Sequence, residues 1–150
     1  MITDLLMQNT PHKHETDSVF DGIETFRKTD QAQVFAEQWI QEARNGNIGP
    51  RHMDLVAWQK CYPPQALGII LILLEKMQHS KVGGDEDVFE KIAGMCVQEI
   101  VEWPDDSFIP VLVEAIRKCP VFELCTRGNR REPESQRWRQ MASLVPVTRC

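Results

Sequence analysis

The stretch that decides the fold covers residues 64–79 and reads PQALGIILILLEKMQH. From Ala66 to Leu74 it is almost wholly apolar, which favours an element buried on several sides. The prolines before this run and the charged pair Glu75-Lys76 after it favour a helix over a buried strand, the alternative for an Ile/Leu run. The run is about half as long as the ~20 residues that cross a bilayer, so we expect a core helix and no membrane segment.

A second strong pattern extends from Val88 to Val101 and repeats with the spacing of a helix over about four turns. Its apolar members are Val88, Phe89, Ile92, Ala93, Cys96, Val97, Ile100 and Val101. Three acidic residues at 85–87 precede it, where negative charge stabilises a helix N-terminus, and Trp103-Pro104 ends it. The sequence therefore predicts that this helix packs against the helix of residues 64–79.

Further helices are predicted where proline, capping and glycine residues frame apolar periodicity. They cover about residues 30–44, 50–61, 104–118 and 133–145. In the second, Met53, Val56 and Ala57 are expected to face inward, with Lys60 as a fourth candidate. The third begins at Pro104 or Ser107, and residues 126–132 are expected to form a polar loop.

Together these patterns predict an all-α fold, a compact bundle of five or six helices. The alternative is a HEAT-like stack, because a proline splits a helix pair on each side of Gly83-Gly84. Residues 1–18 are expected to form a flexible N-terminal arm, since residues 8–17 are polar and lack apolar periodicity. Residues 19–150 are expected to form a single helical domain.

Charge is unevenly distributed along the chain. The net charge of −5 argues against attraction of the whole surface to nucleic acid or to an anionic membrane. Residues 121–150 hold six arginines and three glutamates, a net charge of +3, which leaves −8 for residues 1–120. The five cysteines are an odd number, and the first residues lack a basic flank before an apolar run, so we expect a cytoplasmic protein.

Metal-binding patterns are weak. His12 and His14 offer two imidazoles, but a stable site needs further ligands. Cys119 and Cys125 are separated by five residues, more than in zinc knuckles, and no second cysteine pair accompanies them. We therefore expect no metal and no cofactor.

Catalytic patterns are equally weak. His52 and His79 are the histidines available as a general base, but no pattern places either beside Cys61 or a serine. Cys96 lies on an apolar face, where a thiol is more often a small hydrophobic group than a nucleophile. We expect a protein that is not an enzyme.

The basic C-terminal segment, residues 121–150, is the more informative feature. Its candidate partner-binding residues are Arg127, Arg130, Arg131, Arg137, Trp138 and Arg139. Arginine and tryptophan are enriched at protein interfaces, so we predict a protein–protein interaction role, as an adaptor or inhibitor. Guanidinium groups also suit phosphates and an indole stacks on a base, so nucleic-acid binding is the alternative. A charge of +3 is far below the usual footprint of nucleic-acid binders, and a solvated loop with Trp138 packed inward explains the segment without any ligand.

Residues Val97–Leu124 resemble a pattern found in small helical phage and prophage proteins of the replicative-helicase-loader type. The parts are Trp103-Pro104-Asp105-Asp106, then 111–116 (VLVEAI), then 120–124 (PVFEL). The match covers about a fifth of the chain, and Cys119 stands where an aromatic residue usually precedes the proline. The resemblance implies a non-catalytic phage-type accessory protein that binds a replication or host protein.

Overall fold

The structure, a computed structural model, describes residues 15–46 and 49–147. Every regular element in these ranges is helical, which confirms the all-α prediction. The helices are α2 (Glu15–Arg27), α3 (Asp30–Arg44), α4 (Pro50–Cys61), α5 (Pro63–Gln78), α6 (Asp85–Lys91), α7 (Val97–Glu102), α8 (Ile109–Lys118), α9 (Pro120–Arg131) and α10 (Gln136–Leu144). A π-helical turn η1 (Ile92–Cys96) joins α6 to α7, and a 3-10 turn η2 (Asp106–Phe108) precedes α8. Within residues 15–46 and 49–147, none of the helices combines the length and the apolar composition that a membrane span requires.

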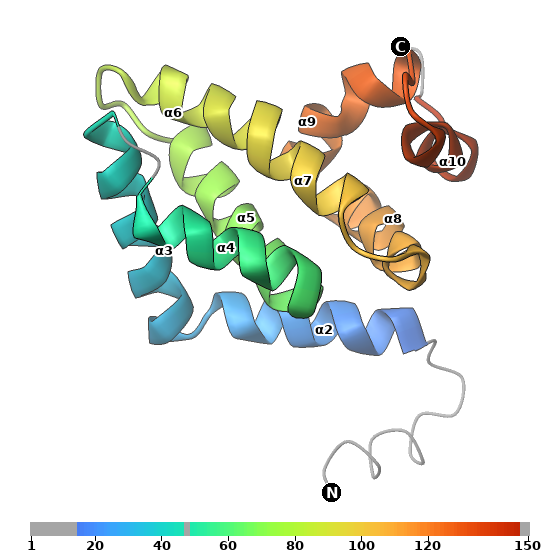
Figure 1. Cartoon of the computed structure of the whole chain (residues 1–150), viewed down its shortest axis with the longest axis horizontal. Coiled ribbons are helices and arrows are strands. Elements are labelled where there is room, and N and C mark those ends of the chain that lie inside the picture. Colours follow the sequence, from blue (N-terminus) through green and yellow to red (C-terminus); the bar gives the residue numbers. More distant parts are fainter. Residues whose placement is uncertain (1–14, 47–48, 148–150) are drawn as a thin grey trace, which may run out of the picture.

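Helix α5 lies at the centre of the fold (Figure 1). All residues from Ala66 to Leu74 are buried, as the apolar run predicts. Helix α5 contacts α2, α3, α4, α6, η1, α7 and α9. A stack of repeats would limit each helix pair to contacts with its neighbours, so the HEAT-like alternative is wrong.

Counting α6, η1 and α7 as one continuous helix, the described residues form eight helices rather than five or six. The first addition is α2, which begins at Glu15 within the predicted arm. Phe20 and Ile23 bury one face of α2 against α5 and α8, a periodicity too short for the sequence pattern to reveal. The rest of the predicted arm, residues 1–14, lies outside the described residues.

The second addition is α9, which continues through the predicted loop of residues 126–132 as far as Arg131. The weak helix propensity of Gly128 and Asn129 favours a loop. In the fold, α9 buries Val121, Phe122 and Thr126 against its neighbours. Burial of one face therefore outweighs the local preference of two residues.

A close approach of α2 to α5 depends on Gly68. A Cβ atom at this position would lie 2.9 Å from Cδ2 of Phe26, closer than such atoms pack. The absence of a side chain therefore lets the Phe26 ring rest on the backbone of α5.

The inward face of α4 differs from the prediction. Met53, Ala57 and Lys60 are exposed and Val56 is half-buried. The buried face consists of His52, Leu55 and Gln59. Two of these three residues are polar, so apolar periodicity pointed to the wrong side of the helix. The correct face is the one that builds the polar cluster described below.

The helix predicted for residues 104–118 also starts at neither of its two expected residues. Asp105, rather than Pro104 or Ser107, provides the cap, and its carboxylate accepts the backbone N–H of Ser107. The 3-10 turn η2 follows, and Pro110 then lies in the first turn of α8, where its missing N–H leaves no bond unmade.

Asp85 does more than begin a helix. Its buried carboxylate accepts hydrogen bonds from Nε of Arg44 at 3.0 Å, from Nη2 of Arg44 at 2.7 Å and from the Ser80 hydroxyl. This bidentate pair ties the end of α3 to the start of α6, which lie close together (Figure 1). Hydrogen bonds from Arg44 and Ser80 lower the pKa of Asp85 to about 2.

This shift predicts a pH dependence of stability. Because the pKa of Asp85 falls from 3.8 to about 2 on folding, its stabilisation is complete above about pH 4. That stabilisation is lost as the pH falls through about 2. The free energy of unfolding of an Asp85→Asn variant is therefore expected to change less between pH 4 and pH 2 than that of the wild type, measured by urea denaturation. The exposed neighbour Asp87, changed to asparagine, is the control, and parallel wild-type and Asp85→Asn profiles would contradict the assignment.

Candidate functional site

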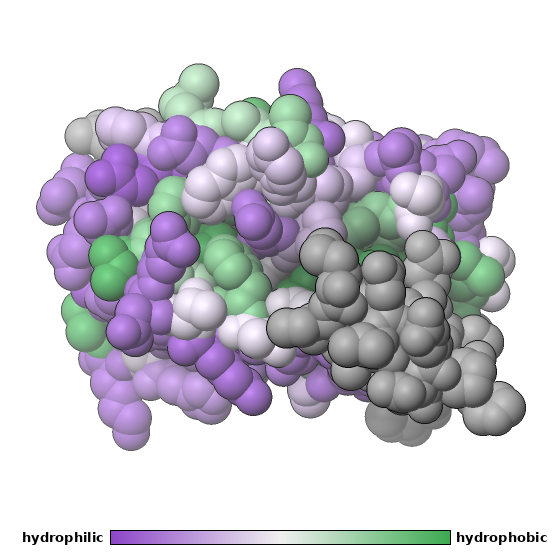
Figure 2. All heavy atoms as spheres, turned by 90° about the horizontal axis from the view of Figure 1, so that it is seen from below, coloured by the Kyte–Doolittle hydropathy of each residue, from purple (hydrophilic) through white to green (hydrophobic). Residues whose placement is uncertain are grey.

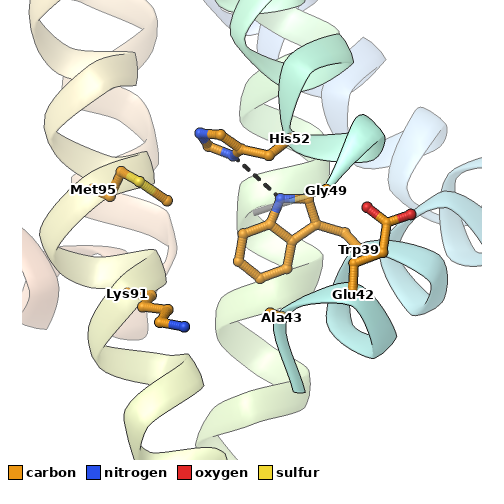
Figure 3. A pocket seen from close by; sticks show the side chains of 7 residues that line it. All are labelled: Trp39, Glu42, Ala43, Gly49, His52, Lys91 and Met95. Atoms are coloured by element: carbon orange, nitrogen blue, oxygen red, sulfur yellow. Dashed lines mark hydrogen bonds between the residues drawn. The ribbon is translucent and has the colours of Figure 1, made fainter. Parts of the chain in front are cut away.

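A buried polar cluster lies where α3, α4 and the η1–α7 segment meet. We call its members the His52 cluster: Trp39, His52, Gln59, Cys96 and Glu99. The indole Nε1–H of Trp39 donates to Nδ1 of His52 over 3.3 Å (Figure 3). The amide Nε2–H of Gln59 donates to Oε1 of Glu99 over 3.2 Å. Nε2 of His52 and Oε1 of Glu99 are 3.6 Å apart.

Backbone geometry brings Cys96 and Glu99 to the same place. They are three residues apart, so both project from one side of the helix. The π-turn η1 ends at Cys96, and such turns are frequent at functional sites. The potential ligand atoms of His52, Cys96 and Glu99 all lie within 4.8 Å of one another. Within residues 15–46 and 49–147, this is the one group of three or more His, Cys, Asp or Glu side chains close enough to share an ion.

Cys96 is not arranged as a nucleophile. Its side chain is fully buried, and burial, together with the nearby Glu99, raises the pKa of the thiol. A protonated, inaccessible thiol reacts poorly, because the thiolate is the attacking species. The cluster therefore suits binding better than covalent chemistry.

Gln59 contributes an unsatisfied hydrogen-bond acceptor to the His52 cluster. Its side chain is fully buried, and its amide nitrogen is held by Glu99. Its Oε1 atom is the one buried side-chain polar atom of the described residues that lacks a hydrogen-bond partner. A buried amide oxygen without a partner costs about 1–3 kcal/mol, so its retention needs an explanation.

A small cavity of about 10 Å³ adjoins the His52 cluster. Figure 3 shows its walls, with Trp39 and His52 on one side and Lys91 and Met95 on the facing helix. This volume is about that of one water-sized probe. The cavity is therefore at the lower limit for holding one water molecule beside the His52 ring.

The basic C-terminal segment is used largely within the fold. Arg130 is buried and donates to Thr126 Oγ1 at 3.1 Å, to the Val145 carbonyl at 2.6 Å and to Glu123. Its guanidinium thus ties α9 to the residue that follows α10.

Arg137 and Trp138 are also committed to internal contacts. Arg137 donates to the carbonyls of Val101 at 2.7 Å and Pro104 at 2.8 Å, which caps the end of α7. Buried Trp138 donates its indole N–H to Gln98 over 3.2 Å. These contacts hold α10 against the rest of the molecule.

The other three predicted partner-binding residues are exposed. Arg127 pairs with Glu123 one turn earlier on α9, and Arg131 and Arg139 lie on the surface. Partner binding by the segment stays a prediction, and the structure places three of its six residues where a partner can touch them directly.

The remaining candidates do not meet in a site. His79 is exposed and is the C-cap residue of α5. Burial raises the pKa of the Cys119 thiol, and that of Cys125 to about 11. Exposed Cys61 ends α4. His12 and His14 lie outside the described residues.

An apolar groove of about 550 Å³ runs between α2, α3 and the neighbouring helices α4 and α5. We call it the α3 groove. Its residues are Phe26, Asp30, Gln31, Ala32, Val34, Phe35, Gln38, Trp58, Gln65 and Ile69. The Phe35 and Trp58 rings pack against each other with centroids 4.7 Å apart and planes tilted by 33°, and Val34 is 55 % exposed. Figure 2 views the α2 side of the molecule and shows an apolar hollow between hydrophilic neighbours.

The molecule thus has three candidate binding sites: the His52 cluster, the basic C-terminal segment and the α3 groove. Comparison of this chain with protein-family models, with curated proteins and with solved structures found no match.

Proposed function

We propose that this chain is a non-catalytic interaction protein, an adaptor or inhibitor, which holds an amphipathic helix of a partner protein in the α3 groove. The observation that carries the proposal is an open, largely apolar groove lined by the Phe35 and Trp58 rings, which pack against each other. Aromatic side chains in such grooves are the usual anchors for a partner helix. An apolar hollow of this kind on a protein surface is typical of an interaction site.

Charge indicates the chemistry of the partner helix. Among the ten residues that line the α3 groove, Asp30 is the one charged residue, and the polar remainder are the glutamines Gln31, Gln38 and Gln65. Residues 1–120 carry a net charge of −8. An apolar stripe flanked by lysine or arginine therefore complements the groove and its surroundings.

The exposed part of the basic segment supplies a second contact in this proposal. Arg131 and Arg139 are exposed on α9 and α10, which lie at the opposite end of the molecule from α3 and outside the groove (Figure 1). They suit acidic residues of a partner that extends beyond the groove. A phage-type replication accessory role, which the resemblance of residues 97–124 implies, is the more specific form of this proposal.

Photo-crosslinking tests the proposal in cells that make the protein. A photoreactive amino acid at position 34, in the groove, is expected to capture one partner chain. The same residue at position 82 is the control, because Val82 is 54 % exposed but lies in the turn before α6, outside the groove. The captured segment is expected to be an amphipathic helix with lysine or arginine beside its apolar stripe.

Affinity for the captured partner gives the quantitative prediction. Val34→Glu is expected to weaken binding by roughly tenfold or more, because a carboxylate is placed against apolar surface. Val82→Glu is expected to leave affinity unchanged in the same titration. Equal effects of the two substitutions, or equal crosslinking at both positions, would remove the α3 groove from the interface.

A further inference from the structure

We propose that His52, Cys96 and Glu99 form a buried site for a divalent transition metal ion, with Zn²⁺ as the best fit. The three ligand atoms already lie within 4.8 Å of one another. Zinc binds nitrogen, sulfur and oxygen at about 2.0–2.3 Å in a tetrahedral arrangement, so two ligand atoms of one ion lie about 3.3–3.8 Å apart. Small side-chain movements therefore close the site around an ion.

The ligand types match zinc in chemistry and in charge. An imidazole nitrogen, a thiolate and a carboxylate form a mixed N, S and O set, which hard cations such as Mg²⁺ and Ca²⁺ do not favour. One thiolate and one carboxylate neutralise a divalent ion, which suits a buried position. The arrangement of two ligands three residues apart on one helix, with the third on a facing helix, is also the usual plan of metal sites in helical bundles.

Gln59 provides an independent observation. Its buried side chain is directed at Glu99 through the Nε2 hydrogen bond, while its Oε1 has no partner among the described residues. The three protein ligands leave one position of a tetrahedral zinc ion open, and a water molecule fills it in many sites. A metal-bound water donates strongly, so Oε1 of Gln59 is suited to accept its hydrogen bond.

Trp39 sets the tautomer of His52, and its indole N–H can report metal binding. Because Nδ1 of His52 accepts the Trp39 N–H, the imidazole proton of the metal-free protein lies on Nε2, facing Glu99. Ligation through Nε2 moves this proton to Nδ1, where it faces the indole N–H and breaks that hydrogen bond. The Cys96 thiol loses its proton to solvent, so one proton is released for each ion bound.

Titration of the metal-free full-length protein with ZnCl₂ tests the site. One Zn²⁺ ion per chain is expected to bind with release of one proton, seen by calorimetry in buffers of different ionisation enthalpy. The Trp39 indole N–H resonance is expected to move as the ion binds. CoCl₂ is expected to produce the thiolate-to-metal charge-transfer absorption that reports ligation by Cys96.

Two substitutions separate this site from adventitious binding at the surface. Cys96→Val keeps an apolar side chain of similar size, and His52→Gln keeps an oxygen to accept the Trp39 N–H. Each is expected to weaken Zn²⁺ binding by roughly 100-fold or more, whereas Cys125→Val, outside the cluster, is not. Circular dichroism confirms that each variant is folded. No saturable binding to the wild type, binding retained by either ligand variant, or an unmoved Trp39 resonance would each overturn the proposal.

Discussion

Replacement of Leu71 by alanine is expected to lower the free energy of unfolding by about 3 kcal/mol. Leu71 is fully buried in the middle of α5, which is enclosed by helices from both halves of the chain. The substitution removes apolar contacts and leaves a cavity that the surrounding helices close only in part. A domain of this size has a free energy of unfolding of about 5–15 kcal/mol, so the substitution is expected to remove a large share of it. Urea denaturation followed by circular dichroism measures the change.

Leu144→Ala is the matched control for this prediction. Leu144 ends α10 and is 50 % exposed, so its loss is expected to change stability by less than about 0.5 kcal/mol. A similar loss for both variants would mean that α5 is not the centre of the core.

The helices whose buried faces consist of apolar residues could be predicted from the sequence. The run from Ala66 to Leu74 is apolar on all sides, and it is the helix that other helices surround. The stripe from Val88 to Val101 likewise forms the continuous α6–α7 helix, whose buried residues include Ile92, Val97 and Ile100. In both cases the residues that the core needs are apolar, so periodicity shows which side is buried.

Prediction failed where polar residues are buried. The inward face of α4 holds His52 and Gln59, and that of α9 holds Thr126 and Arg130. Such residues are buried because they find partners elsewhere in the fold, such as Glu99 for Gln59. Apolar periodicity treats such residues as exposed, so it predicts the wrong inward face for α4 and a loop at the end of α9.

For the same reason, no sequence pattern predicts the His52 cluster. Cys96 and Glu99 are three residues apart and share a helix face, which is visible in the sequence. Cys96 also lies on an apolar stripe, where a core role explains it equally well. A role in the polar cluster is distinguished from a core role by the position of His52, which α4 places beside Cys96 and Glu99. This is a tertiary contact that no local spacing encodes.

Replacement of Arg130 by methionine is expected to lower the free energy of unfolding by about 2–3 kcal/mol. Methionine keeps much of the side-chain volume but none of the donors, so the Val145 carbonyl loses its 2.6 Å bond. The Thr126 hydroxyl loses the Arg130 donor at 3.1 Å and keeps its own bond to the Glu123 carbonyl. Glu123 is 28 % exposed and keeps Arg127, which moderates the loss. Both arginines lower the pKa of Glu123, so its pKa is also expected to rise in the variant.

Arg131→Met is the control that separates the two roles of the basic segment. Arg131 is the next residue on α9 and is exposed, so its substitution is expected to change stability by less than about 0.5 kcal/mol. The Arg130 guanidinium, with a side chain 1 % exposed, acts through the fold, whereas Arg131 is placed to act on a partner. A loss of partner affinity in an Arg130 variant therefore has to be corrected for the fraction of unfolded protein. A loss of partner affinity in Arg131→Met needs no such correction. Equal stability of the two variants in urea denaturation would mean that the buried network contributes nothing and that α9 is held by its apolar face alone.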